Sequence, residues 1–235
     1  MKLDNAVVFV TGANRGLGLA FARQALAAGA RKVYAAARDP SSIMLPGVVP
    51  VRLDVTDAAQ VAQAVAGCAD VTLVVNNAGI ASMGSLLDAD STAALGAMFD
   101  TNVAGLLRVS QAFAPVLAAN GGGAFLNVLS VGSWISSPGL GAYAATKSAA
   151  WSLTNGLRIA LREQGTQVLG LHVGFIDTDL TRGIDLPKLA PAQVVEQAYA
   201  ALEEGQSEVL IDDISRRVKQ GLAAEPGVYL DVIAR

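Results

Sequence analysis

Tyr143 and Lys147 form the residue pair in this sequence that is best suited to acid–base chemistry. They are four residues apart, which places them one turn apart on the same face of a helix. The preceding Pro138–Gly141 segment predicts a helix start there, where the helix dipole favours a tyrosine phenolate. Shifting a phenol pKa from about 10 toward 7 needs roughly 4 kcal/mol of differential stabilisation. We therefore expect a partly buried site, although such pairs are also common on exposed helices.

Two further polar residues stand where they could assist this pair. Ser130 ends the apolar segment FLNVLS, and the carboxyl ends of parallel strands are where ligands bind. Its hydroxyl could donate to a substrate carbonyl oxygen, although an ordinary turn serine is the alternative. Asn102 lies inside a long helical stretch, where asparagine is locally unfavourable. Both residues are candidates for a role in the same site.

The segment Thr11–Gly18, TGANRGLG, follows a strand-like run and opens a helical one. Its glycines allow the backbone to approach a pyrophosphate closely, and the helix start offers N–H groups and a positive dipole end. The spacing Gly-x-x-x-Gly-x-Gly differs from the Gly-x-Gly-x-x-Gly dinucleotide fingerprint. Tight packing between strand and helix is the alternative, but the position in the first strand–helix unit predicts a cofactor loop.

Short β-branched runs alternate with longer Ala/Leu-rich stretches along the whole chain. The predicted buried strands are Ala6–Thr11, Lys32–Ala37, Val49–Asp54, Val71–Asn76, Ala124–Ser130, Gln167–Val173 and Glu208–Ile211. The predicted helices are Leu17–Ala28, Ala58–Ala66, Ala93–Ala119, Tyr143–Glu163 and Pro191–Glu204. This alternation predicts an α/β protein, a single-domain Rossmann fold over residues 1–235, with a doubly wound parallel sheet of about seven strands and helices on both faces.

Composition agrees with a globular enzyme-sized domain. Hydrophobic residues make up 52% of the 235 residues and charged residues 16%, which favours a large core over disorder. A net charge of −3 offers no basic field for nucleic acid or an anionic membrane. Cys68 is the single cysteine, so no internal disulfide can form. We read no signal peptide, membrane span or metal-ligand spacing, and expect a cytoplasmic protein.

Taken in order, five motifs resemble those of the short-chain dehydrogenase/reductase family, with its TGxxxGxG and YxxxK patterns. They are TGANRGLG, Asp54, the NNAG run Asn76–Gly79, Asn102, and Ser130 with Tyr143-x-x-x-Lys147, and they cover nearly the whole chain. The resemblance implies hydride transfer between a nicotinamide and a small carbonyl or alcohol substrate, in a homodimer or homotetramer.

The resemblance also implies a role for each catalytic residue. Tyr143 would exchange the proton, Ser130 would orient the carbonyl, Lys147 would lower the tyrosine pKa and contact the ribose, and Asn102 would hold a relay water. Asp54 would cap the adenine. The implied cofactor-binding residues are Gly12, Asn14, Arg15, Gly16, Leu17, Gly18, Arg38, Asp54, Val55, Asn76, Ala78, Gly79, Tyr143, Lys147, Ile176 and Thr178.

The choice of cofactor depends on the end of the second strand, VYAAARDP. An acid there would bind the ribose 2′-hydroxyl of NAD, whereas an arginine accommodates the 2′-phosphate of NADP. Ala37 occupies the position of the family's acid, Arg38 follows it, and Arg15 lies in the glycine loop. Asp39 is a competing signal, one residue later. The two arginines favour NADP(H) over NAD(H).

Several alternatives stay open. The chain could be an NADP(H)-binding sensor without turnover, or its substrate could be a 3-oxoacyl thioester rather than a ketone or aldehyde. His172 is interpreted as a buried core residue, and Trp134 and Phe175 are candidates for lining the substrate pocket. Val173-Gly174 departs from the family's Pro-Gly, and the carboxyl end predicts a strand and an amphipathic helix.

Overall fold

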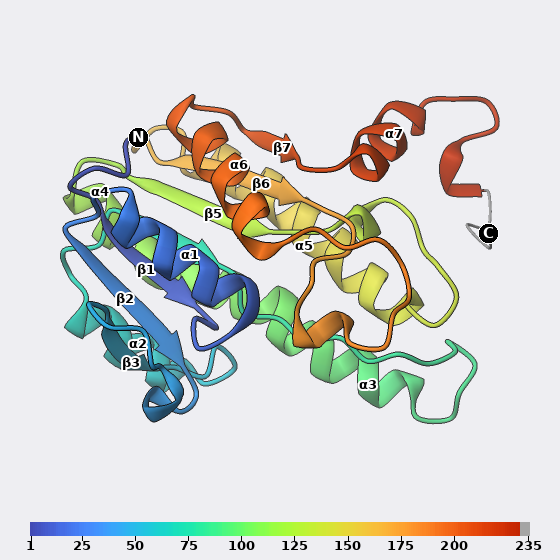
Figure 1. Cartoon of the computed structure of the whole chain (residues 1–235), viewed down its shortest axis with the longest axis horizontal. Helices are drawn as coiled ribbons and strands as arrows, with labels where there is room; N and C mark the ends of the chain where they lie inside the picture. Colours follow the sequence, from blue (N-terminus) through green and yellow to red (C-terminus); the bar gives the residue numbers. More distant parts are fainter. Residues whose placement is uncertain (231–235) are drawn as a thin grey trace.

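A parallel sheet of seven strands forms the centre of the molecule (Figure 1). The computed structural model describes residues 1–230. The strand order is β3-β2-β1-β4-β5-β6-β7, and every adjacent pair is parallel. The strands are β1 (Val7–Thr11), β2 (Lys32–Ala37), β3 (Val49–Arg52), β4 (Leu73–Asn76), β5 (Ala124–Val128), β6 (Gln167–His172) and β7 (Glu208–Leu210). The order reverses direction between β1 and β4, where ligands bind in doubly wound sheets.

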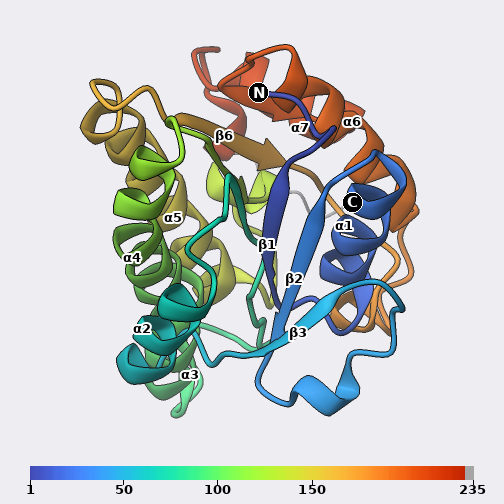
Figure 2. The same ribbon diagram turned by 90° about the vertical axis from the view of Figure 1, so that its left-hand side faces the viewer.

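Helices cover both faces of this sheet. They are α1 (Gly16–Ala27), α2 (Ala58–Gly67), α3 (Ser91–Phe99), α4 (Leu106–Ala119), α5 (Gly141–Ala160), α6 (Pro191–Glu203) and α7 (Asp213–Gly221). Figure 2 shows α1 and α6 on one side of the strands and α2, α4 and α5 on the other. The predicted single-domain Rossmann fold is thereby confirmed, as are the predicted carboxyl-terminal strand and helix. No helix within residues 1–230 is long and apolar enough to cross a membrane.

The central strands are buried on both faces, as their continuous apolar sequences predict. One core cluster packs β-strand side chains against α1 and α6, and a second packs them against α2 and α4. The prediction of a buried strand at residues 49–54 is wrong, because β3 is an edge strand and Val49 is 42% exposed. The edge strand β7 is only half-buried for the same reason.

The predicted helix Ala93–Ala119 is wrong as one continuous element. A π-helical turn, Asp100–Gly105, separates α3 from α4. Gly105 packs so closely that an added Cβ would lie 2.7 Å from a methyl of Val55. Asn102 is buried in this turn and bonds to the chain that follows β4. Single π-turns inside helices often occur at functional sites, because they redirect one side chain.

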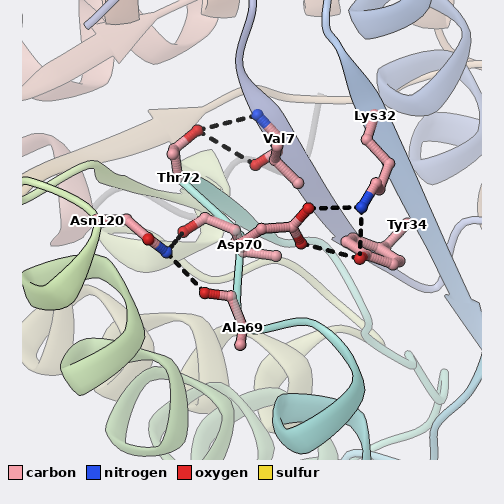
Figure 3. A network of polar contacts seen from close by, with 8 residues as sticks. Val7, Lys32, Tyr34, Ala69, Asp70, Thr72 and Asn120 are labelled. Atoms are coloured by element: carbon pink, nitrogen blue, oxygen red, sulfur yellow. Dashed lines mark hydrogen bonds and ion pairs between the residues drawn. The ribbon is translucent and has the colours of Figure 1, made fainter.

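Polar contacts fix the edge of the sheet at which the strands begin (Figure 3). Lys32, at the start of β2, lies 2.5 Å from a carboxylate oxygen of Asp70 and donates to the Tyr34 hydroxyl. The Tyr34 hydroxyl donates in turn to Asp70 at 2.9 Å. Asn120, which follows α4, donates to two backbone carbonyls just before β4. The loops that carry the candidate site lie at the opposite side of the sheet, at the carboxyl ends of the strands.

Cys68 is the C-cap residue of α2. It is 2% exposed and belongs to the core cluster on the α2 and α4 side. Burial raises the pKa of its thiol to about 12, and the nearby carboxylate of Asp70 acts in the same direction.

Candidate active site

Tyr143 occupies the first turn of α5, where the sequence places it. The helix begins at Gly141, and Lys147 follows one turn later, with its Nζ 5.7 Å from the centroid of the Tyr143 ring. The Lys147 ammonium donates to the backbone oxygen of Val128 at 2.9 Å, at the end of β5. Lys147 is buried, so a charged side chain lies beside the phenol at the carboxyl edge of the sheet.

Burial shifts the pKa values of this pair in opposite directions. It raises the pKa of Tyr143 to about 12, while a hydrogen bond with the Ser130 hydroxyl acts to lower it. It lowers the pKa of Lys147 to about 8. The expected shift of the phenol toward 7 does not arise from the protein's own groups, because desolvation outweighs the stabilising contact. Tyr143 is a neutral phenol at neutral pH and is suited to donate a proton.

Ser130 lies just beyond β5, in the position that the sequence predicts. Its Oγ accepts a hydrogen bond from the backbone N–H of Gly132 at 3.0 Å, which leaves the hydroxyl hydrogen for another acceptor. Its backbone oxygen accepts from the N–H of Ser133 and contacts the His172 ring, each at 3.0 Å. The hydroxyl is therefore held within reach of Tyr143 by backbone contacts on both sides.

Asn102 joins the chain after β4 to α5. Its side-chain oxygen accepts from the N–H of Ile80, and its amide nitrogen donates to the oxygen of Ile80 and to the Thr146 hydroxyl. Thr146 in turn donates to the backbone oxygen of Tyr143 at 2.7 Å. Thr146 was not predicted from the sequence, which holds no signal that its hydroxyl faces inward. The relay role of Asn102 stays a prediction, whereas its position behind the helix is clear.

The glycine loop has the shape of an anion cradle. Gly12 and Gly16 adopt φ angles of +65° and +53°, which side chains other than glycine rarely allow. A Cβ on Gly18 would lie 2.1 Å from the Gly12 oxygen. No side chain caps the first turn of α1, so its N–H groups, next to Arg15 and Leu17, point toward the loop without a side-chain acceptor. These features suit a phosphate group.

The loop that follows β6 lies against this cradle. A Cβ on Gly16 would lie 3.3 Å from a methyl of Thr178. A cavity of about 410 Å³ is lined by Gly16, Asp177, Thr178, Asp179, Arg182, Gly183 and Lys188. Ile176 forms a β-bridge with Leu189, which closes the loop on itself. The fold therefore brings the predicted positions Ile176 and Thr178 next to the glycine loop.

At the end of β2, Arg38 has no ion-pair partner within residues 1–230, and Asp39 is hydrogen-bonded to Ser41. Ala37 is buried and Arg38 is exposed. The pKa of Asp54 is lowered mainly by its hydrogen bonds from Thr56 and to a smaller extent by the charge of Arg38. The carboxylate of Asp39 accepts from the N–H and hydroxyl of Ser41, and so caps the short helix that follows. Arg15 lies elsewhere, with its Nη1 3.1 Å from a carboxylate oxygen of Asp179.

Asp54 does not cap α2. Its carboxylate accepts from the N–H and hydroxyl of Thr56, while Asp57 is the N-cap residue of the helix. Val55, next to it, is buried. Asp54 thus presents its second oxygen from a fixed turn, at the position predicted to meet an adenine.

The NNAG run ties β4 to its neighbours. The side-chain amide of Asn76 donates to Ser110 and Asn127 in the interior, so both of its hydrogens are used within the protein. Asn77, which was not among the predicted site residues, donates to the backbone oxygens of Thr11 and Gly12. The backbone N–H of Ala78 donates to the Thr11 hydroxyl, and Gly79 lies against Asn102. These contacts set the position of the glycine loop relative to β4.

Trp134 belongs to a buried aromatic cluster. Its ring stacks on His172 with centroids 3.9 Å apart and packs edge-on against Trp151. The buried position predicted for His172 is confirmed. The role of Trp134 in lining the substrate pocket stays a prediction, and the residue is 9% exposed. Phe175 is half-buried at the start of the loop after β6. Residues 1–230 contain no group of three or more His, Cys, Asp or Glu side chains arranged to hold a metal.

Comparisons with known proteins agree with this geometry. The sequence pattern of the family described as "short chain dehydrogenase" matches residues 6–188. The crystal structure of a short chain dehydrogenase from Burkholderia cenocepacia J2315 in complex with NADP is 38% identical, with a TM-score of 0.92 over 96% of each chain. Galactitol 2-dehydrogenase (L-tagatose-forming) of Cereibacter sphaeroides is 35% identical over 77% of this chain and 75% of its own. NADPH carbonyl reductase 2 of Sus scrofa is 30% identical over 81% of this chain and 80% of its own.

Proposed function

The chain belongs to the short-chain dehydrogenase family, and from that premise we propose that it is an NADP(H)-dependent oxidoreductase that interconverts a small carbonyl compound and its alcohol. The observation that carries the proposal is the convergence of Ser130, Tyr143 and Lys147 at the end of β5. A hydroxyl donor, a protonated phenol and a buried ammonium are the groups that a carbonyl oxygen needs when it becomes an alkoxide.

In the direction of reduction, the Ser130 hydroxyl donates to the carbonyl oxygen of the substrate and orients it. Tyr143 then transfers its phenol proton to that oxygen, and the adjacent Lys147 ammonium stabilises the phenolate that is left. When bound, the nicotinamide supplies or accepts the hydride at the substrate carbon. Asn102 holds the loop after β4 and, through Thr146, the first turn of α5. The proposed role of Asn102 is to hold a water that returns a proton to Tyr143.

The preference for NADP(H) is supported by the groups around the end of β2. Ala37 offers no carboxylate to a ribose 2′-hydroxyl, and Asp39 is engaged by Ser41. The exposed guanidinium of Arg38 can meet a 2′-phosphate, and Arg15 can join it by exchanging its surface contact with Asp179. The similar Burkholderia cenocepacia protein binds NADP. The uncapped N-terminus of α1 and the glycine cradle suit the pyrophosphate.

A panel of aldehydes, ketones and polyols, assayed with NADP(H) and NAD(H), tests the proposal. The polyols are included because one similar protein is a galactitol 2-dehydrogenase. We expect turnover of at least one compound and a kcat/KM at least about tenfold higher with NADP(H), because a phosphate–arginine contact contributes about 1.5–3 kcal/mol. Tight NADPH binding without turnover across the panel would favour the sensor.

The variant Tyr143→Phe provides the residue-level test. It keeps the ring and removes the proton, so kcat should fall by about 10² to 10⁴-fold while the NADPH dissociation constant stays the same. Tyr229→Phe, at an exposed tyrosine, is the matched control and should match the parent. Turnover retained in Tyr143→Phe, with fold and cofactor affinity unchanged, would refute the assignment.

A second copy of this chain is the partner that we propose for the face formed by α4 and α5. A groove of about 690 Å³ lies between these helices, and its lining includes Leu107, Pro115, Leu153 and Leu157. Exposed apolar grooves of this kind commonly mark protein interfaces. Isologous contact between two such faces would form a dimer.

A further inference from the structure

Half of the large hydrophobic side chains that are exposed within residues 1–230 lie on two loops, and we refer to this group as the apolar rim. Its members are Ile80, Met83, Leu86 and Leu87 after β4, and Leu180 and Leu186 after β6. Leu87 is 95% exposed and Met83 is 65% exposed. Single exposed apolar side chains are ordinary, whereas a group of them in one place marks a binding surface.

The two loops flank the end of β5, beyond which Ser130 lies. In the sheet, β5 pairs with β4 on one side and with β6 on the other, and all three strands are parallel. Both loops therefore start from the same edge of the sheet. The loop after β4 leads to α3, and the loop after β6 leads to α6 on the opposite face (Figure 2). The apolar rim is thus divided between the two sides of the strand ends.

Contacts join the loop after β4 to the start of α5. A Cβ on Gly141 would lie 2.8 Å from a methyl of Leu86, and a Cβ on Gly139 would lie 3.6 Å from the methyl of Met83. Tyr143 stands in the first turn of α5, which begins at Gly141. The apolar rim is therefore continuous with the turn that carries Tyr143.

In the loop after β6, polar side chains contact their own loop and the glycine loop, while two leucines stay exposed. The carboxylate of Asp179 forms ion pairs with Arg15 and Arg182. The Nζ of a lysine further along, Lys188, donates to a backbone oxygen of the same loop at 2.8 Å. The exposed fractions of the two leucines, at positions 180 and 186, are 51% and 52%. Their apolar surface is available to a group that lies beside them.

The composition of the loops is unsuited to a substrate with many hydroxyl groups. A polyol or sugar needs hydrogen-bond partners for the hydroxyls that leave water. The two segments that meet at the start of α5, residues 83–87 and 136–141, contain no charged residue. The carboxylate of Asp88, which comes next, accepts from the N–H of Ser85 at 2.7 Å. An alkyl or aryl group needs no such partners, and it would remove apolar side chains from water.

We propose that the substrate is a ketone or aldehyde with an apolar body, alkyl or aryl, that lies between the loops after β4 and β6 in contact with the apolar rim. Its carbonyl oxygen lies at Ser130 and Tyr143. This inference rests on the proposed oxidoreductase function and adds the class of substrate to it. It distinguishes the substrate of this chain from the polyol for which the similar galactitol 2-dehydrogenase is named.

A homologous series of ketones from 2-butanone to 2-octanone, assayed with NADPH, tests the substrate class. Each buried methylene favours binding about two- to fourfold, so kcat/KM should rise by at least about fifteenfold across the series. The value for 2-octanone should exceed that for L-tagatose by at least about tenfold. Equal values across the series, or a preference for L-tagatose, would overturn the inference.

Leu86→Ser and Leu186→Ser test the apolar rim one loop at a time. Each should lower the ratio of kcat/KM for 2-octanone to that for 2-butanone by about three- to tenfold, because a hydroxyl replaces apolar contact with the end of the chain. Ile159→Ser is the matched control. This isoleucine is 72% exposed near the other end of α5, about 24 Å from its first turn, and the ratio should stay parental. A parental ratio in both rim variants would contradict the inference.

Binding without turnover separates this inference from the proposed function. Octanamide and acetamide carry a carbonyl that nicotinamide does not reduce, and calorimetry with the protein saturated with NADP measures their affinities. Octanamide should bind at least about fifteenfold more tightly. If no carbonyl compound or polyol is turned over, the proposed function fails, and this preference would still support the apolar rim as a binding surface.

Equal affinities for the two amides would show that the apolar rim does not contact the ligand. A second copy of the chain is the other possible occupant of these loops. A lower molar mass of Leu186→Ser than of the parent, measured by light scattering, would identify that occupant and overturn the inference.

Discussion

Tyr143 in this protein is a neutral phenol, and that protonation state distinguishes the two reaction directions. Because its pKa is raised to about 12, the proton is in place for carbonyl reduction throughout the neutral range. Alcohol oxidation needs the phenolate. At pH values below the pKa, the population of the phenolate rises tenfold for each unit by which the pH increases. We expect kcat/KM for oxidation to rise with pH between 6 and 8 with a slope near one, and that for reduction to stay flat. An oxidation rate that falls with pH would contradict this assignment.

Lys147 should make the folded protein less stable than it would be without the charge. Its folded pKa of about 8 lies below the ordinary value of 10.5, so folding below pH 8 buries an ammonium at a penalty that disappears as the pH rises toward 10.5. Lys147→Met should therefore raise the free energy of unfolding at pH 7 by about 1 to 3 kcal/mol, although Val128 loses its donor.

Urea unfolding of the parent and of Lys147→Met measures the difference between their free energies of unfolding. This difference should become smaller as the pH rises from about 8 to 10. Lys2→Met, at a lysine whose side chain is 72% exposed, is the control and should change little. An unfolding midpoint for Lys147→Met at or below that of the parent at pH 7 would show that the lysine stabilises the fold.

The sequence could predict which residues form this site, but not their electrostatics. The spacing of Tyr143 and Lys147 follows from helix geometry, and Ser130 from the end of a strand. The direction of the tyrosine pKa could not be predicted, because desolvation depends on what the rest of the chain places around the ring. His172 and Glu208 are 36 residues apart by their numbering, and only the pairing of β6 with β7 brings them together.

At the scale of elements, the turn between β1 and α1 depends on the absence of a side chain at Gly18. A Cβ there would lie 2.1 Å from the Gly12 oxygen and 2.5 Å from the Asn77 amide. Gly18→Ala should therefore separate the strand from the helix, reduce NADPH affinity by more than about tenfold and destabilise the fold by about 1–3 kcal/mol. Fluorescence titration with NADPH and urea unfolding measure the two effects.

The matched control for that variant is Gly96→Ala in α3, where an added Cβ meets no atom within 4 Å. It should leave NADPH affinity unchanged and stabilise the protein by about 0.5–1 kcal/mol, because alanine is the better helix former. Equal NADPH affinity in Gly18→Ala and Gly96→Ala would show that the glycine cradle does not bind the cofactor.

Two elements differ from the sequence prediction for reasons that lie outside the segments themselves. Residues 93–119 have helical character throughout, and the π-turn at Asn102 arises from its bonds to Ile80 and Thr146. The segment at 49–54 has the composition of a buried strand, but its place at the edge of the sheet exposes it. Local composition does not reveal which strand ends up at an edge.

For the whole molecule, alternation of strands and helices was enough to predict the doubly wound sheet, because crossover rules leave few arrangements.

The assembly of two copies of the chain is a separate prediction. Gly156, in the groove between α4 and α5, has open space around its Cβ position. Gly156→Glu should leave the fold intact and convert a dimer to monomers, as measured by light scattering. Gly96→Glu is the control and should stay dimeric, and a dimeric Gly156→Glu would exclude this face.

The buried thiol of Cys68, at the end of α2, provides a chemical measure of how often the folded protein opens. Cys68 is the only cysteine in the sequence. Its side chain is 2% exposed and its thiol has a pKa of about 12, so the folded state presents no accessible thiolate that could attack a thiol reagent. Labelling can proceed only through openings that lift α2 from the sheet or unfold the chain, so its rate reports how often those openings occur. A ligand that binds the folded state should slow labelling in proportion to its occupancy. Cofactor and substrate candidates can thus be ranked by reaction at Cys68, without observing any turnover.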